Sequence, residues 1–363
     1  MTQCTEFWVS RNNLRDTRII NASMPAPAEG EVLVAIDRFA LTSNNVSYAV
    51  SGDNIGYWGY FPAADDWGKV PVWGCANVIE SCCPQVPVGE RLWGFFPMAS
   101  HALLRPGKIR DDQFLDVAEH RSALPALYNG YRRTRAEPAF LQAMENERCL
   151  LFPLFATSWL IYDYLVDNGF FGAKQVLIGS VSSKTGFGLA DMLHSDPNVS
   201  QRVIGFTSPS NVGFVERLGC CDEVRLYGEE TDIDAALPAA YVDMSVDARL
   251  TAALHNHLGD NMVDSAMVGA THWEQRGDTG KLPGAKPTFF FAPAQIGKRD
   301  GEWGPGVAMM KAMTASAEVA QKVVDELDVE WIRDAQDLAT VWVELLDNKV
   351  SPNRGLMISL LQE

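Results

Sequence analysis

The chain has 363 residues, which is enough for two domains. Its formal net charge of −16 argues against nucleic acid and against an anionic membrane surface as partners. The composition, 47% hydrophobic and 21% charged, is ordinary for a soluble globular protein. Seven cysteines are an odd number without the spacing of a disulfide framework, which indicates a reducing compartment.

Two segments bear on membranes. The first eight residues contain no basic region followed by an apolar stretch, so we expect no signal peptide. The most apolar segment, 149–166, contains Pro153 and Asp163 and is too short to span a bilayer. We therefore expect a cytoplasmic protein that has neither a membrane nor a nucleic-acid partner.

The first hundred residues predict β-structure. Apolar runs broken by glycine and proline recur about every ten residues, a spacing that suggests a barrel or sandwich. The predicted strands are 31–37, 70–80, 90–96 and 100–105. Between them, 52–67 is a long loop rich in glycine and aromatic residues (Tyr57, Trp58, Tyr60, Phe61, Trp67).

Residues 107–147 are more charged, and we expect them to form a helical insertion. They contain an unusual cluster of two tyrosines and two arginines, Tyr128, Tyr131, Arg132 and Arg133. These side chains could close over a substrate, or they could form a solvated helix face that packs its stems on the domain.

From about residue 150 to 295, predicted strands and helices alternate, which indicates a doubly wound parallel sheet. The predicted strands are 175–179, 202–207, 222–226, 240–244, 262–269 and 287–291, and the predicted helices are 156–168, 186–195 and 211–218. Residues 307–346 read as helical. We expect 352–360 to form a last strand that returns to the first domain.

The most informative segment is 175–190, a buried strand followed by a turn of small residues and a helix. A turn of this kind lets backbone N–H groups and the helix dipole bind a pyrophosphate. Ser180, Ser182 and Ser183 stand where glycines are typical, so an ordinary strand–helix turn is the alternative. A P-loop is excluded because Ser183 and Ile178 occupy the positions that its glycines require.

The next strand ends in Thr207 and Ser208, followed by Ser210 and Asn211, without the carboxylate that would bind the free ribose 2′-hydroxyl of NAD. Hydroxyls, an amide and a nearby cation such as Lys184 suit a 2′-phosphate better, so we expect NADPH/NADP. The alternative is a solvated turn that contacts no ligand.

Several segments, in this order, resemble the medium-chain dehydrogenase/reductase superfamily and its zinc-free quinone oxidoreductase branch. They are Gly30–Gly52, Val72–Glu80, Pro87–Gly94 and Leu218–Tyr227. More narrowly, three segments resemble the uncharacterised bacterial family DUF2855. These are Thr157–Asp163, Ser182–Thr185 and Phe289–Pro293.

The resemblance implies an α/β protein with two domains. A GroES-like, β-rich catalytic domain would comprise 1–147 and 296–363, and a Rossmann domain with a doubly wound parallel sheet would comprise 148–295. Zinc-dependent members use ligands at positions that here hold Ser43 and Gly74-Cys75-Ala76. One cysteine cannot supply the three or four ligands of a zinc site, so we expect no metal.

The resemblance also directs attention to particular residues. Asn45 and Tyr48 in the first loop, Tyr128, and His272 at a strand end could polarise a carbonyl or move a proton. Asn45 could instead shape a turn, and His272 could be structural. The predicted cofactor-binding residues are Ser180, Ser182, Ser183, Lys184, Thr185, Gly186, Thr207, Ser208, Asn211, Tyr227, Asp243, Ser245, Gly269 and Phe291.

The resulting hypothesis is a metal-free, NADPH-dependent oxidoreductase that transfers hydride to an apolar α,β-unsaturated carbonyl or quinone-like substrate. The aromatic residues of the first loop suggest a planar or apolar small molecule. A homodimer is possible, because sheet extension is common in the superfamily. The alternative is a dinucleotide-binding sensor or scaffold with little catalysis.

Overall fold

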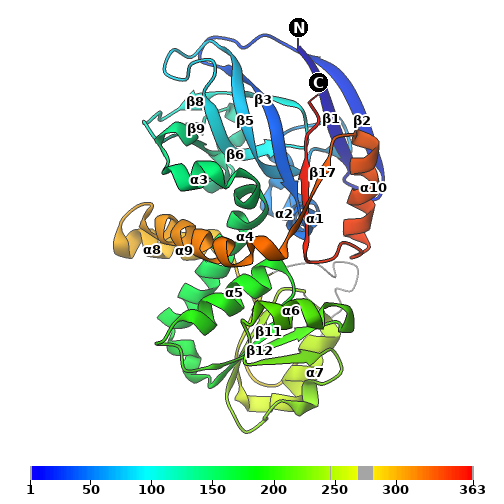
Figure 1. The fold of residues 1–363 in the computed structure, drawn as a ribbon, viewed down its shortest axis with the longest axis vertical. Coiled ribbons are helices and arrows are strands. Elements are labelled where there is room, and N and C mark those ends of the chain that lie inside the picture. The colour runs from blue at the N-terminus through cyan, green and yellow to red at the C-terminus, as the bar shows by residue number, and fades with distance from the viewer. Residues whose placement is uncertain (1, 246, 269–280, 362–363) are drawn as a thin grey trace. The chain divides into compact units, whose positions relative to one another are not determined.

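The computed structural model describes residues 2–245, 247–268 and 281–361. The chain divides into two compact units. Unit 1 comprises Met1–Leu150, Asp328–Val350 and Arg354–Glu363, and unit 2 comprises Leu151–Leu327 and Ser351–Asn353. Figure 1 shows the elements of both units.

Unit 1 is built on two sheets. One has three strands in the order β2-β1-β4, and the other follows the path β17-β18-β3-β5-β6-β10-β9-β8, with β7 paired to β3. The strands are β1 (Thr2–Ser10), β2 (Thr17–Met24), β3 (Val32–Leu41), β4 (Trp67–Gly68), β5 (Pro71–Ser81), β6 (Arg91–Pro97), β7 (His101–Leu104), β8 (Pro106–Gly107), β9 (Gln113–Asp116), β10 (Gly130–Arg133), β17 (Asp328–Ile332) and β18 (Arg354–Ile358). Its helices include α1 (Ser43–Val50), α2 (Gly52–Ile55), α3 (Ala139–Ala143) and α10 (Ala335–Leu346), and α4 (Glu145–Asp167) begins in it.

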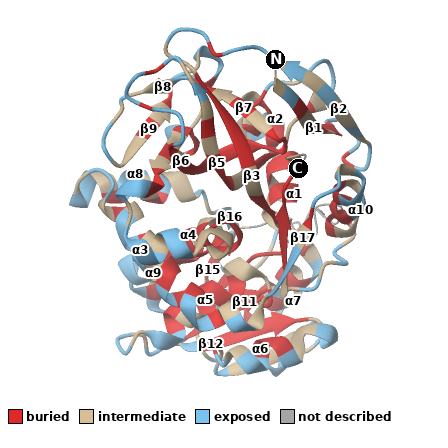
Figure 2. Ribbon diagram, turned by 45° about the horizontal axis from the view of Figure 1, so that its top comes forward, coloured by how far each residue is buried: buried red, intermediate tan, exposed pale blue. Residues whose placement is uncertain are grey.

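The centre of unit 1 is the antiparallel pair β3 and β5, which lies buried in Figure 2. Val32 to Ile36 of β3 are all buried, as expected for an apolar strand covered on both faces. The expected return strand is confirmed as β18, in which Met357 pairs with Ala40 of β3. The hairpin of β1 and β2 was not predicted.

The expectation of a helical insertion at 107–147 is wrong for much of its length. β9 and β10 pair antiparallel, and β10 also pairs with β6, so this segment extends the large sheet. Tyr131 is buried and donates a hydrogen bond of 2.6 Å to the carbonyl of Phe95. Arg133 is buried and paired with Glu90. Tyr128 is also buried, so three of the four residues belong to the core and do not form a solvated helix face. Arg132 is partly exposed and pairs with Asp112 at 2.9 Å.

Unit 2 contains a parallel sheet in the order β13-β12-β11-β14-β15-β16. Its strands are β11 (Gln175–Gly179), β12 (Arg202–Thr207), β13 (Glu223–Leu226), β14 (Ala239–Asp243), β15 (Met262–Met267) and β16 (Thr288–Phe289). The helices between them are α5 (Lys184–Ser195), α6 (Val212–Leu218) and α7 (Ala248–Leu258). The strand order reverses direction at β11, so right-handed crossovers place α5 and α6 on one face and α7 on the other. This is the expected doubly wound sheet.

The boundary expected at residue 296 is wrong, because 296–327 belong to unit 2. This segment includes most of α8 (Ala292–Trp303) and all of α9 (Val307–Val323). Arg299 of α8 pairs with Asp163 of α4 at 2.7 Å, and Lys322 of α9 pairs with Asp191 of α5 at 2.8 Å. The chain re-enters unit 1 at β17, a strand inside the stretch that was expected to be helical.

Within the described residues, α4 is the one helix that is long and apolar enough to cross a membrane, judged by length and composition. Its most apolar window has a mean hydropathy of 1.5, and 72% of that window is buried inside the protein. Such burial is typical of a core helix in a soluble protein.

Gly188 of α5 allows α5 to pack closely on α4. A Cβ atom there would lie 2.6 Å from Phe155 Cδ1 and 2.8 Å from Ser158 Oγ. We expect Gly188→Ala to lower the free energy of unfolding by about 1–3 kcal/mol, measured by urea denaturation. Gly213→Ala on α6 is the matched control: its Cβ meets nothing nearer than 3.8 Å, so we expect it to be neutral or stabilising. Equal effects of the two substitutions would contradict the packing argument.

Candidate functional site

The turn between β11 and α5 has the geometry of a tight strand-to-helix connection. Ser180 adopts a positive φ of 55°, a conformation that usually favours glycine. Ser183 caps α5, its Oγ accepting a hydrogen bond from the backbone N–H of Gly186 at 3.1 Å. A Cβ atom on Gly186 would lie 2.6 Å from the carbonyl oxygen of Ser180, so glycine is required there. The helix N-terminus is thus held close against the turn.

The end of β12 meets this turn. Asn211 Nδ2 donates to Ser182 Oγ at 3.2 Å, and the hydroxyls of Ser208 and Ser210 lie 3.0 Å apart. Thr207 is fully buried, and its Oγ1 has no hydrogen-bond partner in the part of the chain that the structure describes. The structure therefore brings together Ser182, Thr207, Ser208 and Asn211, which were predicted as cofactor-binding residues.

Tyr227 follows β13 and lies beside the same turn. Its backbone N–H donates to the carbonyl of Thr207 at 3.3 Å. Burial raises the pKa of the Tyr227 phenol to about 12, and a hydrogen bond with Ser180 opposes that increase. The phenol is therefore protonated at neutral pH and can donate a hydrogen bond at this edge of the sheet.

Asp243 and Ser245, at the end of β14, have partners within the protein. Asp243 Oδ1 accepts hydrogen bonds from the backbone N–H and the hydroxyl of Ser245, at 2.9 and 2.8 Å. Asp243 Oδ2 accepts one from Thr251 at 3.1 Å, and Ser245 Oγ accepts one from the N–H of Asp247. These contacts shape the loop that leads into α7.

Lys184 is the first residue of α5. Its Nζ donates a hydrogen bond of 3.0 Å to the carbonyl of Pro352. Pro352 lies in Ser351–Asn353, a short segment near the end of the chain that belongs to unit 2. Burial lowers the pKa of Lys184 to about 8. The ammonium is thus anchored next to the turn, which sequence alone did not predict.

The remaining predicted site residues either have contacts other than those described above or fall outside the described part of the chain. The carbonyl of Thr185 accepts a hydrogen bond from Ser158 at 2.8 Å. Phe291 precedes α8, is 37% exposed, and stacks on Phe289. Gly269 and His272 lie outside the described residues.

In unit 1, four tyrosines form one group, here named the tyrosine cluster: Tyr48, Tyr57, Tyr60 and Tyr128. Tyr48 comes from α1 and Tyr128 from a short 3-10 helix, Ala126–Asn129. The hydroxyls of Tyr57 and Tyr128 lie 3.0 Å apart, and Tyr60 donates to the carbonyl of Pro125 at 2.8 Å. Two predicted catalytic residues, Tyr48 and Tyr128, are therefore neighbours.

Aromatic residues from the sheet support the cluster. Trp73 Nε1 of β5 donates to the Tyr48 hydroxyl at 3.3 Å, and Trp73 stacks on Trp93 of β6. Phe95 of β6 packs against Tyr128 at 4.7 Å between ring centroids. Burial raises the pKa of Tyr48 and of Tyr128, so both phenols stay protonated at neutral pH and can act as donors.

Asn45 has a structural role, in agreement with the alternative that it shapes a turn. Its Oδ1 accepts the backbone N–H of Thr42 at 2.8 Å, which is one half of a capping box at the start of α1. Its Nδ2 donates to the carbonyl of Pro71 at 2.9 Å. Both ends of the buried amide are therefore used to fix α1 against β5.

Sequence reasoning noted Tyr57 and Tyr60 as loop aromatics but did not identify them as hydroxyl partners. Two tyrosines three residues apart in a glycine-rich loop were the available signal. In the described residues, no three His, Cys, Asp or Glu side chains are grouped in a way that could hold a metal ion.

The fold resembles several solved structures over nearly the whole chain. CurA from Vibrio vulnificus in complex with NADPH has a TM-score of 0.64 at 13% identity, covering 99% of this chain and 100% of that chain. The yhdH oxidoreductase from Salmonella enterica in complex with NADP has a TM-score of 0.53 at 13% identity, covering 99% of each. A mutant enoyl thioester reductase from Candida tropicalis has a TM-score of 0.55 at 12% identity, covering 99% and 100%.

The chain has the medium-chain dehydrogenase/reductase fold: a β-rich unit and a unit with a doubly wound parallel sheet, in which a tight turn joins the inner strand β11 to α5. The model of the family described as "Protein of unknown function (DUF2855)" matches residues 39–351, and the chain belongs to this family. A search of curated proteins finds no match to the sequence.

Proposed function

We propose that this protein is an NADPH-dependent oxidoreductase of the zinc-independent type, which reduces an apolar α,β-unsaturated carbonyl or quinone-like small molecule. The observation that carries the proposal is the hydrogen bond between Asn211 and Ser182. It brings the polar end of β12 to the turn whose helix N-terminus favours a pyrophosphate.

The residues at this edge fit a phosphorylated dinucleotide. Gly186 adds no side chain at the start of α5, where a Cβ atom would meet the turn, and Thr207 to Asn211 offer hydroxyls and an amide but no carboxylate. The buried Thr207 Oγ1, unpartnered among the described residues, is a further polar atom at this strand end. NADP-bound neighbours with the same fold support the choice. NADPH, when bound, supplies a hydride.

Lys184 is proposed to bind the 2′-phosphate. We expect Lys184→Met to weaken NADPH binding about 10- to 150-fold, equivalent to roughly 1.5–3 kcal/mol for one charge-assisted contact, with little change for NADH. Fluorescence titration of both cofactors measures this. Lys184→Arg should keep the preference, and Lys174→Met, at an exposed lysine before β11, should leave both affinities unchanged. Equal wild-type affinities for NADPH and NADH would overturn the assignment.

The same lysine predicts a pH dependence. Its lowered pKa of about 8 means that it is protonated below that pH and becomes neutral above it. A 2′-phosphate becomes a dianion above roughly pH 6, by analogy with other phosphate monoesters. NADPH should therefore bind most tightly between about pH 6 and 8 and more weakly as the pH rises further. NADH titrated in parallel lacks the phosphate, and an identical fall for NADH would contradict the role of Lys184.

The tyrosine cluster is proposed as the substrate-binding and proton-donating part of unit 1. Hydride addition to a conjugated carbon leaves an enolate, which needs hydrogen-bond donors and a proton. The phenols of Tyr48 and Tyr128 are protonated at neutral pH because burial raises their pKa. The surrounding rings suit an apolar or planar substrate.

A direct test mixes purified protein and NADPH with a panel of enones, quinones and aldehydes and follows the loss of NADPH absorbance. The proposal predicts turnover with enones or quinones and little with simple aldehydes, in enzyme freed of metal by chelation. Turnover that requires stoichiometric zinc would contradict the zinc-independent assignment. NADPH binding without turnover across the panel would favour a dinucleotide-binding sensor or scaffold.

Two further expectations accompany this proposal. A cytoplasmic location stays a prediction, which rests on seven cysteines without the spacing of a disulfide framework. A homodimer also stays a prediction. β16 forms an edge of the unit 2 sheet and both of its residues are exposed, so a second copy of the sheet could pair with it.

A further inference from the structure

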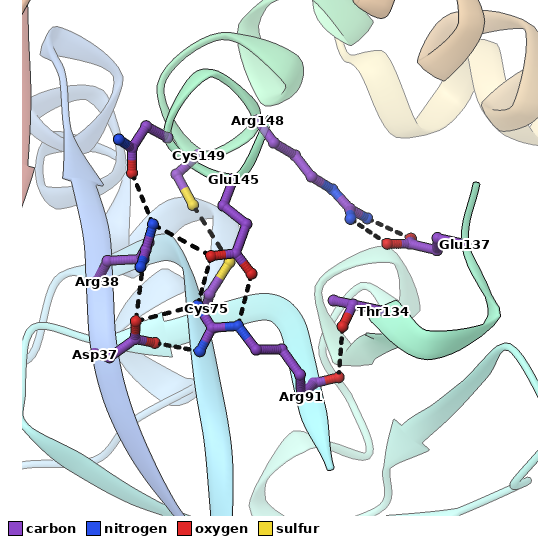
Figure 3. Close-up of polar contacts among 10 residues, drawn as sticks. Asp37, Arg38, Cys75, Arg91, Thr134, Glu137, Glu145, Arg148 and Cys149 are labelled. Carbon is purple, nitrogen blue, oxygen red and sulfur yellow. Dashed lines mark hydrogen bonds and ion pairs between the residues drawn. The ribbon is translucent and has the colours of Figure 1, made fainter. Parts of the chain in front are cut away.

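Two cysteines that are distant in sequence are in contact within unit 1. Cys75 Sγ of β5 and Cys149 Sγ in the first turns of α4 lie 3.9 Å apart. Figure 3 shows the two sulfur atoms facing each other. Both residues are buried, with exposed fractions of 0% and 2%. The proposed reductase chemistry uses neither thiol.

Ion pairs hold the start of α4 against the sheet and so fix Cys149 beside Cys75 (Figure 3). Arg91 of β6 binds Glu145 of α4 and Asp37 of β3, each at 2.6 Å. Arg38 of β3 also contacts Glu145, at 3.2 Å, and donates to Asn146 Oδ1 at 3.0 Å. These contacts join β3, β6 and the start of α4, so they hold Cys149 of α4 close to Cys75 in the same sheet.

We propose that Cys75 and Cys149 are an oxidation site, at which a peroxide converts the two thiols into a disulfide that joins β5 to α4. A disulfide has an S–S length near 2.05 Å, so the sulfurs must approach each other by about 2 Å. Side-chain rotation and a small shift of the first turn of α4 can supply this movement. The seven cysteines include one exposed residue, Cys82, whose sulfur instead contacts the carbonyl of Pro27.

The chemistry balances with hydrogen peroxide as the oxidant. One sulfur attacks a peroxide oxygen and becomes a sulfenic acid, and the O–O bond breaks to release water. The second sulfur then attacks the sulfenic sulfur, the S–O bond breaks, and a second water leaves. Two thiols lose two protons and two electrons, and the peroxide takes up both and is reduced to two waters.

Burial and the neighbouring charged groups determine how fast this oxidation proceeds. Burial raises the pKa of the Cys149 thiol, the neighbouring Cys75 adds to the increase, and the guanidinium groups of Arg148 and Arg38 oppose it. Because the thiolate is the reacting form, oxidation should take longer than at an exposed thiol. The test therefore uses prolonged incubation and mapping of individual bonds.

The full-length reduced protein is incubated with hydrogen peroxide, the remaining thiols are alkylated under denaturing conditions, and peptides are mapped by mass spectrometry without reduction. We expect a peptide pair linked through Cys75 and Cys149, two fewer alkylated thiols than the seven in the reduced chain, and full reversal by dithiothreitol. Cys149→Ser should abolish the link, and Cys220→Ser should preserve it. The proposal is overturned if both residues stay alkylatable in wild type while Cys82 is oxidised, or if either links to another cysteine instead.

Discussion

Replacing Tyr128 by phenylalanine is expected to lower kcat for an enone or quinone substrate by about 10²–10⁴-fold, the usual contribution of a positioned proton donor. The Tyr128 hydroxyl lies 3.0 Å from that of Tyr57, so the two phenols form a hydrogen-bonded pair. Burial raises the pKa of both, which keeps them protonated and able to donate to a developing enolate. The dissociation constant of NADPH should not change, because unit 2 supplies the proposed cofactor residues.

Tyr60→Phe is the matched control for this experiment. It removes one hydroxyl from the same cluster. In the described residues, that hydroxyl donates to the carbonyl of Pro125 and is not hydrogen-bonded to another tyrosine. We expect a cost of about 1 kcal/mol in the free energy of unfolding and a kcat close to wild type. If Tyr128→Phe keeps wild-type turnover, or if both variants lose turnover equally, the proton-donor role of Tyr128 is wrong.

Arg148→Met is expected to lower the free energy of unfolding by about 3–5 kcal/mol, because it leaves a mostly buried carboxylate without its partner. Arg148 is 2% exposed in its side chain and binds both oxygens of Glu137, whose side chain is 11% exposed (Figure 3). Its guanidinium also lies 4.2 Å from the ring centroid of Trp93. Urea denaturation measures the loss.

Two comparisons separate the ion pair from the general effect of substitution. The double variant Arg148→Met with Glu137→Gln removes the stranded charge and should recover much of the lost stability. Arg11→Met breaks a pair of exposed side chains, Arg11 and Asp53, and should cost at most about 1 kcal/mol. A loss for Arg148→Met no larger than that for Arg11→Met would show that burial does not strengthen this pair.

The parallel sheet of unit 2 was predictable because its signal is local. The run Val176-Leu177-Ile178 is bounded by a turn, and β11 and β12 begin and end at the predicted residues. β17 was not found, since its first three residues are exposed and the pairing with β18 is formed by residues 26 positions later in the chain. The return of the chain to unit 1 at Asp328 was not predicted either, because it depends on the same distant pairing of β17 with β18.

In the candidate site, too, local features could be predicted from the sequence and long-range contacts could not. The turn at Ser180–Gly186 follows from a contiguous pattern, and the capping role of Asn45 three residues after Thr42 was also present in the sequence. The pairing of Tyr57 with Tyr128 joins residues 71 positions apart, and that of Cys75 with Cys149 joins residues 74 apart. Such contacts depend on how β5, β6 and their connections fold, which no local pattern specifies.

The central claim, a site for a phosphorylated dinucleotide in unit 2, is tested most directly by titrating the purified full-length protein with NADPH and, separately, with NADH. The account predicts saturable binding of NADPH that is clearly tighter than that of NADH, with the difference reduced in Lys184→Met. The absence of binding by either cofactor, or equal binding of both, would contradict it.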